Sequence, residues 1–157
     1  MLAPARIRPS PQRTESQSKC FVCGQANAGG LRIQFHSAGD GSVEARWKPE
    51  ETLEGFPGIV HGGIVATLLD EAMSKAIAAL GCTALTAELK VRYRRPVRSG
   101  KELAVRGWVL DRQKRRVRAE AAVVDRDGIE SAHGWGTFLS ASETAASTRM
   151  EEETIQK

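Results

Sequence analysis

The residues best suited to chemistry lie in one stretch of the chain. A His61-Gly62-Gly63 turn is followed, nine residues after the histidine, by the carboxylate of Asp70. Glycines let a backbone approach a ligand closely, and the first turn of a helix carries unpaired N–H groups at the positive end of its dipole. A carboxylate in an apolar helix is costly unless it has a task or a partner. Together these groups could stabilise an oxyanion and move a proton, as acyl transfer requires.

The helix that must carry these residues is predicted over 64–80, where nearly every position is apolar or small. Such a helix is buried, and Gly81 is a natural stop at its end. Alternating apolar and polar residues predict strands, two before the helix at 31–36 and 42–48, and four after it at 83–97, 102–110, 116–125 and 130–139. This order predicts an α+β fold with one helix on an antiparallel sheet. The sheet is too large for one helix to cover, which favours dimerisation.

The bulk properties of the 157 residues indicate one soluble globular domain. A net charge of +4 suits a small anionic ligand at least as well as nucleic acid, and 5% aromatic residues argue against base stacking. No apolar run is long enough to cross a bilayer, so we expect neither a nucleic-acid nor a membrane partner. We predict a disordered leader over 1–18, a domain over 19–140 and a flexible tail over 141–157.

The cysteines raise the question of a metal site. Cys20 and Cys23 form a Cys-x-x-Cys pair that, with His36, resembles part of a zinc site. A closed zinc site needs four ligands, usually from two pairs, and the third cysteine, Cys82, lies beyond the helix. We therefore expect no metal, and we interpret the pair as a small turn that packs Phe21 on the core. Three cysteines are not a disulfide framework, which favours a reducing compartment and a cytoplasmic location.

Three segments of the chain carry a family resemblance. They read Glu-Gly-Phe-Pro-Gly-Ile-Val-His-Gly-Gly at 54–63, Leu-Leu-Asp-Glu at 68–71 and Thr-Ala-Glu-Leu-Lys-Val-Arg-Tyr-Arg-Arg-Pro-Val at 86–97. Together with the Cys-Phe-Val-Cys-Gly leader, they resemble the hotdog-fold acyl-CoA thioesterases of the PaaI (phenylacetate-pathway) type. The resemblance implies a sheet of about six strands wrapped around one long central helix. It also implies hydrolysis of an acyl-CoA to free acid and CoA by a homodimer, or by a homotetramer built as a dimer of dimers.

The resemblance also implies roles for individual residues. Asp70 would activate a water molecule or attack directly, and the backbone N–H of Gly62 or Gly63 would polarise the thioester carbonyl. His61 would orient the loop or the thioester. Thr86 matches a Ser/Thr position that, in relatives, helps to hold the nucleophilic water from the neighbouring subunit, so the site would be shared across a dimer interface. This chemistry needs no metal or redox cofactor, and coenzyme A enters only as part of the substrate.

A second group of residues is assigned to substrate binding. Some relatives carry Asn or Gln six residues before the histidine as a second polariser. This chain has Gly55 there, followed by Phe56 in a Gly-Phe-Pro-Gly loop whose backbone is the alternative donor. Glu71 lies about 100° round the helix from Asp70 and cannot share its aim, so it contacts substrate, a strand or an interface. Arginines are either a solvated face or ligands for the CoA phosphates, and the residues assigned to these phosphates are Arg92, Arg94 and Arg95.

Two other functions stay open at this point. A hydratase or dehydratase on the same fold would use His61 as its catalytic residue. A non-catalytic acyl-CoA-binding domain would keep the pocket alone. Fold does not separate these functions. Asp70 does, because a mere binder would not need a carboxylate in an apolar helix.

Overall fold

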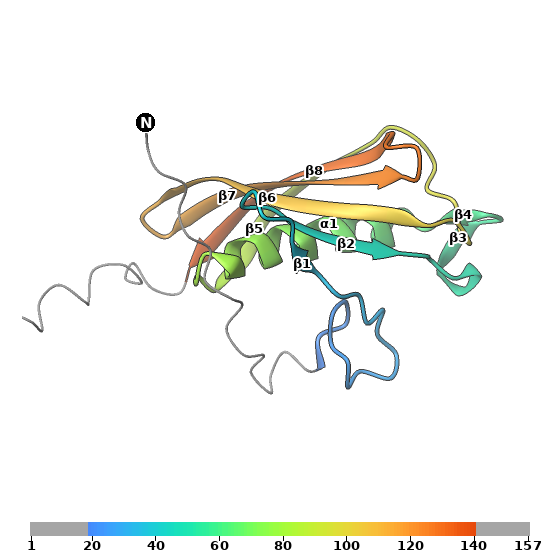
Figure 1. Ribbon diagram of the computed structural model, residues 1–157, viewed down its shortest axis with the longest axis horizontal. Helices are drawn as coiled ribbons and strands as arrows, with labels where there is room; N and C mark the ends of the chain where they lie inside the picture. The colour runs from blue at the N-terminus through green and yellow to red at the C-terminus, as the bar shows by residue number, and fades with distance from the viewer. Residues whose placement is uncertain (1–18, 141–157) are drawn as a thin grey trace, which may run out of the picture.

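One long helix lies against a six-stranded antiparallel sheet in the computed structural model, which describes residues 19–140 (Figure 1). The sheet has the order β1-β2-β6-β7-β8-β5, and its strands are β1 (His36–Ser37), β2 (Val43–Trp47), β5 (Ala84–Tyr93), β6 (Leu103–Gln113), β7 (Arg116–Asp125) and β8 (Glu130–Ser140). Before the helix α1 (Gly62–Ala79) come a 3₁₀ turn η2 (Glu51–Leu53) and a hairpin of β3 (Glu54–Phe56) and β4 (Ile59–Val60). The α+β class with one helix is therefore confirmed. The predicted leader over 1–18 and tail over 141–157 lie outside the described residues.

The predicted strand over 31–36 is wrong except at its last residue. Only His36 and Ser37 pair with β2, and the segment before them, blue in Figure 1, runs outside the sheet. Its backbone instead folds on itself, because the N–H of Leu31 donates to Phe21 O at 2.8 Å and the N–H of Ile33 donates to Val22 O at 2.8 Å. The alternating pattern in this segment reflects the burial of Ile33, although the segment is not paired with the sheet.

The Cys-x-x-Cys turn packs on the core through other residues than expected. Phe21 is 46% exposed, whereas Val22 and Cys23 are buried. The expectation that Phe21 covers the core is wrong, because the two residues that follow it are buried in its place.

The helix approaches the sheet closely where glycines replace side chains. Buried residues of α1 include Leu68, Leu69 and Met73. A Cβ at Gly107 of β6 would lie 2.3 Å from the carbonyl oxygen of Ala72. Since real Cβ atoms do not approach this closely, glycine at this position lets the helix backbone rest directly on β6.

Strand β5 contains a bulge that changes which side its residues face. Its pairing with β8 shifts between Thr86 and Glu88, so Ala87 has no partner in the register. Residues 86 and 93 are an odd number of positions apart, and strict alternation would place them on opposite faces. One extra residue places both on the helix side. At this end of the strand the alternation of apolar and polar residues does not match the buried face, and the apolar Leu85 is 78% exposed.

No helix in the described part of the chain is both long enough and apolar enough to span a membrane.

Candidate functional site

The start of helix α1 is capped by His61, which leaves one backbone donor free. His61 Nδ1 accepts a hydrogen bond from the N–H of Gly63 at 2.9 Å. The N–H groups of Ile64 and Val65 donate to the carbonyl oxygen of His61 at 2.9 and 3.2 Å. Among the described contacts, the N–H of Gly62 is the one group of this first turn without a partner. Of the two glycines that the sequence offered as oxyanion donors, only Gly62 therefore has its N–H available.

Tyr93 holds the residue that carries this free donor. Its hydroxyl, at the end of β5, donates to the carbonyl oxygen of Gly62 at 2.8 Å. A Cβ at Gly62 would lie 3.5 Å from the tyrosine ring. Sequence reasoning assigned no role to Tyr93, although the Tyr-x-x-Pro end of its strand was part of the family resemblance and was the signal that pointed to it.

Gly55 leaves room for the histidine cap. A Cβ at this position would lie 3.1 Å from His61 Cδ2 and 3.2 Å from His61 Cα. These approaches are tighter than most real Cβ contacts, so a larger side chain here would require His61 to shift by a few tenths of an ångström.

A cavity of about 440 Å³ opens beside the helix start. Its lining includes Gly55, Phe56, Gly62 and Tyr93. Phe56 is 74% exposed, although it is large and apolar. Two larger hollows, of about 600 and 500 Å³, are lined neither by Asp70 nor by the residues of the helix start. The second of them adjoins the cavity, since both are lined by residues 95–97. The 440 Å³ cavity therefore offers a ligand both an apolar wall and a free backbone donor.

Asp70 and Thr86 form the second part of the site. Asp70 is half-buried on α1, and the hydroxyl of Thr86 on β5 donates to Asp70 Oδ1 at 2.8 Å. Burial raises the pKa of the Asp70 carboxyl above its ordinary value, and the hydrogen bond from Thr86 opposes the shift without cancelling it. The charge of Glu71 raises this pKa further. A carboxylate that takes up a proton more readily than usual is suited to general-base work.

Thr86 and Asp70 belong to the same chain, so the hydroxyl and the carboxylate reach the site together. The resemblance implied that Thr86 reaches in from a neighbouring subunit, and for its position relative to Gly62 this stays a prediction. Gly62 lies eight residues before Asp70, which corresponds to about 12 Å along a helix that rises 1.5 Å per residue. Within one chain, a single thioester carbonyl cannot contact both groups.

Glu71 contacts the N-terminal segment instead of the cavity. Each of its carboxylate oxygens lies 3.8 Å from Cys20 Sγ, and Lys75 Nζ lies 3.4 Å from Oε1. Three possible metal-ligand atoms lie within 4.8 Å of one another, namely Cys20 Sγ, Cys23 Sγ and one Glu71 oxygen. Sequence reasoning missed this cluster because no local spacing relates positions 20 and 23 to position 71.

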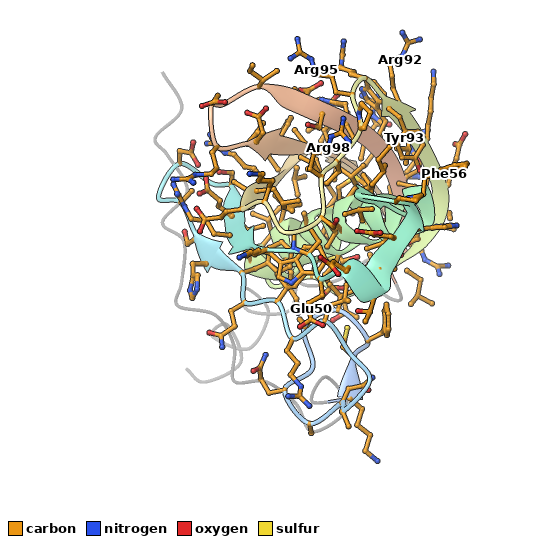
Figure 2. All side chains as sticks on the ribbon, turned by 90° about the vertical axis from the view of Figure 1, so that its right-hand side faces the viewer. Glu50, Phe56, Arg92, Tyr93, Arg95 and Arg98 are labelled. Carbon is orange, nitrogen blue, oxygen red and sulfur yellow. The ribbon has the colours of Figure 1, made fainter. Side chains whose placement is uncertain are left out.

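The three arginines assigned to phosphate binding differ in their surroundings. Arg94 Nε forms an ion pair with Glu130 at 2.6 Å. Arg94 and Arg95 line the 440 Å³ cavity, whereas Arg92 does not. Figure 2 shows Arg92 and Arg95 at the same end of the molecule as Phe56 and Tyr93. This end of the molecule therefore carries exposed positive charge beside the cavity.

Sequence comparisons find relatives with named activities. The model of the thioesterase superfamily matches residues 57–132. A putative esterase, SSO1253, of Saccharolobus solfataricus is 29% identical over 122 residues, which cover 76% of this chain and 81% of that protein. Human acyl-coenzyme A thioesterase 13 is 28% identical over 85 residues, which cover 53% of this chain and 61% of that protein.

Comparisons with solved structures give the same family. One thioesterase superfamily protein is 32% identical with a TM-score of 0.61, and the match covers 69% of this chain and 84% of that one. A second is 30% identical with a TM-score of 0.72, and this chain spans 61% of its length. The E. coli PaaI protein of the phenylacetic acid degradation operon, 20% identical with a TM-score of 0.66, shares the fold over 75% of this chain and 83% of its own. The chain therefore belongs to the thioesterase superfamily and has its hotdog fold.

Proposed function

We propose that this protein hydrolyses an acyl-CoA thioester to a free acid and coenzyme A. The observation that carries the proposal is the Asp70–Thr86 pair, a half-buried carboxylate with a raised pKa in an otherwise apolar helix. A half-buried carboxylate costs folding free energy, so its presence needs a reason. A hydrolase needs a general base at this place, whereas a binding domain does not. Membership of the thioesterase superfamily and similarity to a named acyl-CoA thioesterase support the substrate class.

The reaction follows from the donors and acceptors of the site. Asp70 accepts a proton from a water molecule, which the Thr86 oxygen also holds through its free lone pairs. The water oxygen bonds to the thioester carbon, and the carbonyl oxygen becomes an oxyanion that accepts a hydrogen bond from Gly62 N–H. The C–S bond then breaks, and the leaving thiolate takes the proton from Asp70. A general base contributes about 10²–10⁴-fold to such a rate, and one oxyanion donor about 10²–10³-fold.

The complete site requires two copies of the chain. Strand β5 is at the edge of the sheet, and its outer side has no strand partner among the described residues. Its Thr86 end lies beside Asp70, and its Tyr93 end lies beside Gly62. Antiparallel pairing of two such edges about a two-fold axis near residues 89–90 places the Thr86 end of one copy opposite the Tyr93 end of the other. The free donor of one copy then approaches the base of the other.

Arginines at the cavity mouth suit the phosphates of coenzyme A. Arg95 lines the cavity that contains Gly62, and Arg92 lies at the same end of the molecule. Arg94 is occupied by Glu130, so we assign the main phosphate contacts to Arg95 and Arg92. One guanidinium group can donate two parallel hydrogen bonds to the oxygens of a phosphate. With its phosphates held at the cavity mouth, the ligand would direct its thioester end toward the helix start.

A proline at position 62 tests the oxyanion donor. Gly62→Pro removes the N–H, and proline is favoured at the first position of a helix. His61 has φ −56° and ψ 133°, the extended conformation that a residue before proline prefers. We expect Gly62→Pro to melt near the wild-type temperature and to lose about 10²–10³-fold in kcat. Gly62→Ala is the matched control, because it keeps the N–H and its methyl group would lie 3.5 Å from the Tyr93 ring.

Release of free thiol from a panel of acyl-CoAs, followed with a thiol-reactive dye, measures these activities. Absence of turnover on short, long and aryl acyl groups alike would reject the proposed hydrolase. Hydration of an enoyl-CoA without thiol release would instead favour the hydratase alternative. Binding without either reaction would favour the non-catalytic alternative.

Complementation between two inactive variants tests the shared site. A dimer of one Asp70→Asn chain and one Gly62→Pro chain contains one intact site, because each chain supplies the group that the other lacks. Co-expressed at equal levels, random pairing makes half of the dimers mixed and restores about a quarter of the wild-type activity. If base and donor acted within one chain, the mixed protein would be as inactive as either parent.

A further inference from the structure

A cluster about 100° round the helix from Asp70 contains two thiols and a carboxylate. Cys20 and Cys23 come from the N-terminal segment, and Glu71 comes from α1. The N–H of Gly24 donates to the carbonyl oxygen of Cys20 at 2.9 Å and closes the turn between the two cysteines. Their sulfur atoms and one Glu71 oxygen lie within 4.8 Å of one another. The cysteines are half-buried and buried, so the cluster is shielded from solvent.

We propose that Cys20, Cys23 and Glu71 bind a divalent, thiophilic metal ion such as Zn²⁺. Zinc lies about 2.3 Å from thiolate sulfur and about 2.0–2.2 Å from carboxylate oxygen, so tetrahedral coordination separates two sulfurs by about 3.8 Å and sulfur from oxygen by about 3.5 Å. Cys20 Sγ is already 3.8 Å from both oxygens of Glu71. The remaining pairs lie within 4.8 Å, so the two sulfurs need to approach by about 1 Å at most, and Cys23 Sγ and the Glu71 oxygen by about 1.3 Å at most. Three protein ligands leave the fourth position to a water molecule.

The ligand set also explains why sequence reasoning expected no metal. That expectation sought a second pair of Cys or His residues. The third ligand is instead a carboxylate that tertiary packing brings to the pair across 51 positions of sequence. Spacing within the chain carries no signal for it.

Charge balance favours the bound ion. Two thiolates and one carboxylate carry three negative charges, and a divalent ion with the Lys75 ammonium carries three positive charges. Lys75 Nζ lies 3.4 Å from Glu71 Oε1, which leaves Oε2 for the metal. Binding therefore releases two protons from the thiols and buries no net charge, so affinity should rise with pH.

The same surroundings argue against a redox disulfide. Cys23 is buried and Cys20 is half-buried. Oxidation to a disulfide needs a thiolate that an oxidant can reach, and redox-sensing cysteines are accessible to solvent. A metal ion, in contrast, deprotonates a coordinating thiol outright. The bound ion would tie the N-terminal segment to the helix residue next to Asp70.

Cobalt substitution tests the site without substrate, so its outcome is independent of the proposed hydrolase activity. The full-length protein is reduced, freed of metal with a chelator and titrated with Co²⁺. We expect one Co²⁺ per chain, with sulfur-to-cobalt absorption in the near ultraviolet and the visible bands of tetrahedral cobalt, both removed by Zn²⁺. Cys20→Ser and Glu71→Gln should weaken binding by on the order of 100-fold or more. Cys82→Ser is the matched control, since this third cysteine bonds to Ser140 away from the cluster, and it should bind as the wild type does.

Thermal unfolding of the wild-type protein supplies a second readout if Cys20→Ser or Glu71→Gln does not fold. The wild-type protein should melt at a higher temperature with Zn²⁺ than without it, and a chelator should reverse the difference. Absence of thiolate–cobalt absorption in the wild type would overturn the proposal. Equal binding by Cys20→Ser and the wild type would also overturn it, as would a Cys20–Cys23 disulfide, two hydrogens lighter by mass, in place of metal binding.

Discussion

Asp70→Asn should separate catalysis from stability, because it moves the two in opposite directions. Asparagine cannot accept the proton of the attacking water, so kcat should fall by about 10²–10⁴-fold. This loss corresponds to about 2.7–5.5 kcal/mol of transition-state free energy. The amide oxygen of asparagine can still accept the hydrogen bond that Thr86 donates to Asp70 at 2.8 Å, so local structure is kept.

The stability of the same variant follows from the direction of the pKa shift. Burial raises the pKa of Asp70 above 3.8, so the folded protein holds this proton more tightly than the unfolded chain does. The stabilisation from the protonated carboxyl is complete below the unfolded value and is lost as the pH rises through the folded value. At neutral pH the ionised group therefore destabilises the fold. Asn at position 70 never ionises, and its melting temperature should equal or exceed that of the wild type.

Thiol release from acyl-CoA and thermal unfolding at neutral pH measure the two effects on one preparation. In the wild type, activity should rise with pH through the raised pKa of Asp70. Thr86→Ala serves as the companion variant, and its loss should not add to that of Asp70→Asn if the two residues act as a unit. Wild-type activity in Asp70→Asn would refute the assignment of Asp70 as the general base, and Glu71 or His61 would then be the candidates. A marked loss of stability would instead make Asp70 a structural acid.

Three further changes test other parts of the structure. His61→Ala removes the acceptor for Gly63 N–H and should lower the free energy of unfolding in urea by about 1 kcal/mol, whereas His61→Asn should keep the cap. Gly107→Ala places a methyl group 2.3 Å from the oxygen of Ala72 and should cost about 1–3 kcal/mol or more in the same assay. Arg95→Ala should raise KM for acyl-CoA, most at low salt, and leave KM unchanged for an acyl thioester that lacks the nucleotide.

Long periodic patterns made most of the fold predictable. Helix α1 and strands β5 to β8 follow from runs of about ten or more residues, because burial of one face repeats often enough along such a run to be recognised. Short elements lack this repetition. The hairpin of β3 and β4 is therefore absent from the predicted strands, and the segment at 31–36 is predicted as a strand although its backbone pairs with residues of its own turn.

The sequence was enough to predict most residues of the candidate site, but not which hydrogen-bond partners they have. The His-Gly-Gly turn and Asp70 were found from helix-start chemistry and a buried charge. The rotamer of His61 decides which of the two glycine N–H groups is hydrogen-bonded and which stays available for a ligand. Spacing along the sequence does not determine a rotamer. Likewise, Thr86 was recognised as a hydroxyl position, but the bulge at Ala87 decides that it faces the helix.

The unpaired residue in β5 has a consequence for how this protein can change over evolution. Ala87 is exposed, so many side chains could replace it without loss. Removal of this one residue leads to the same arrangement. Thr86 and Leu89 would then lie two positions apart, so regular alternation alone would keep both on the helix side, and Thr86 could stay opposite Phe138. The bulge is therefore how a strand that is one residue longer than regular pairing needs still directs Thr86 toward Asp70. At this point selection must preserve the phase between Thr86 and Leu89, more than the identity or the presence of the residue between them.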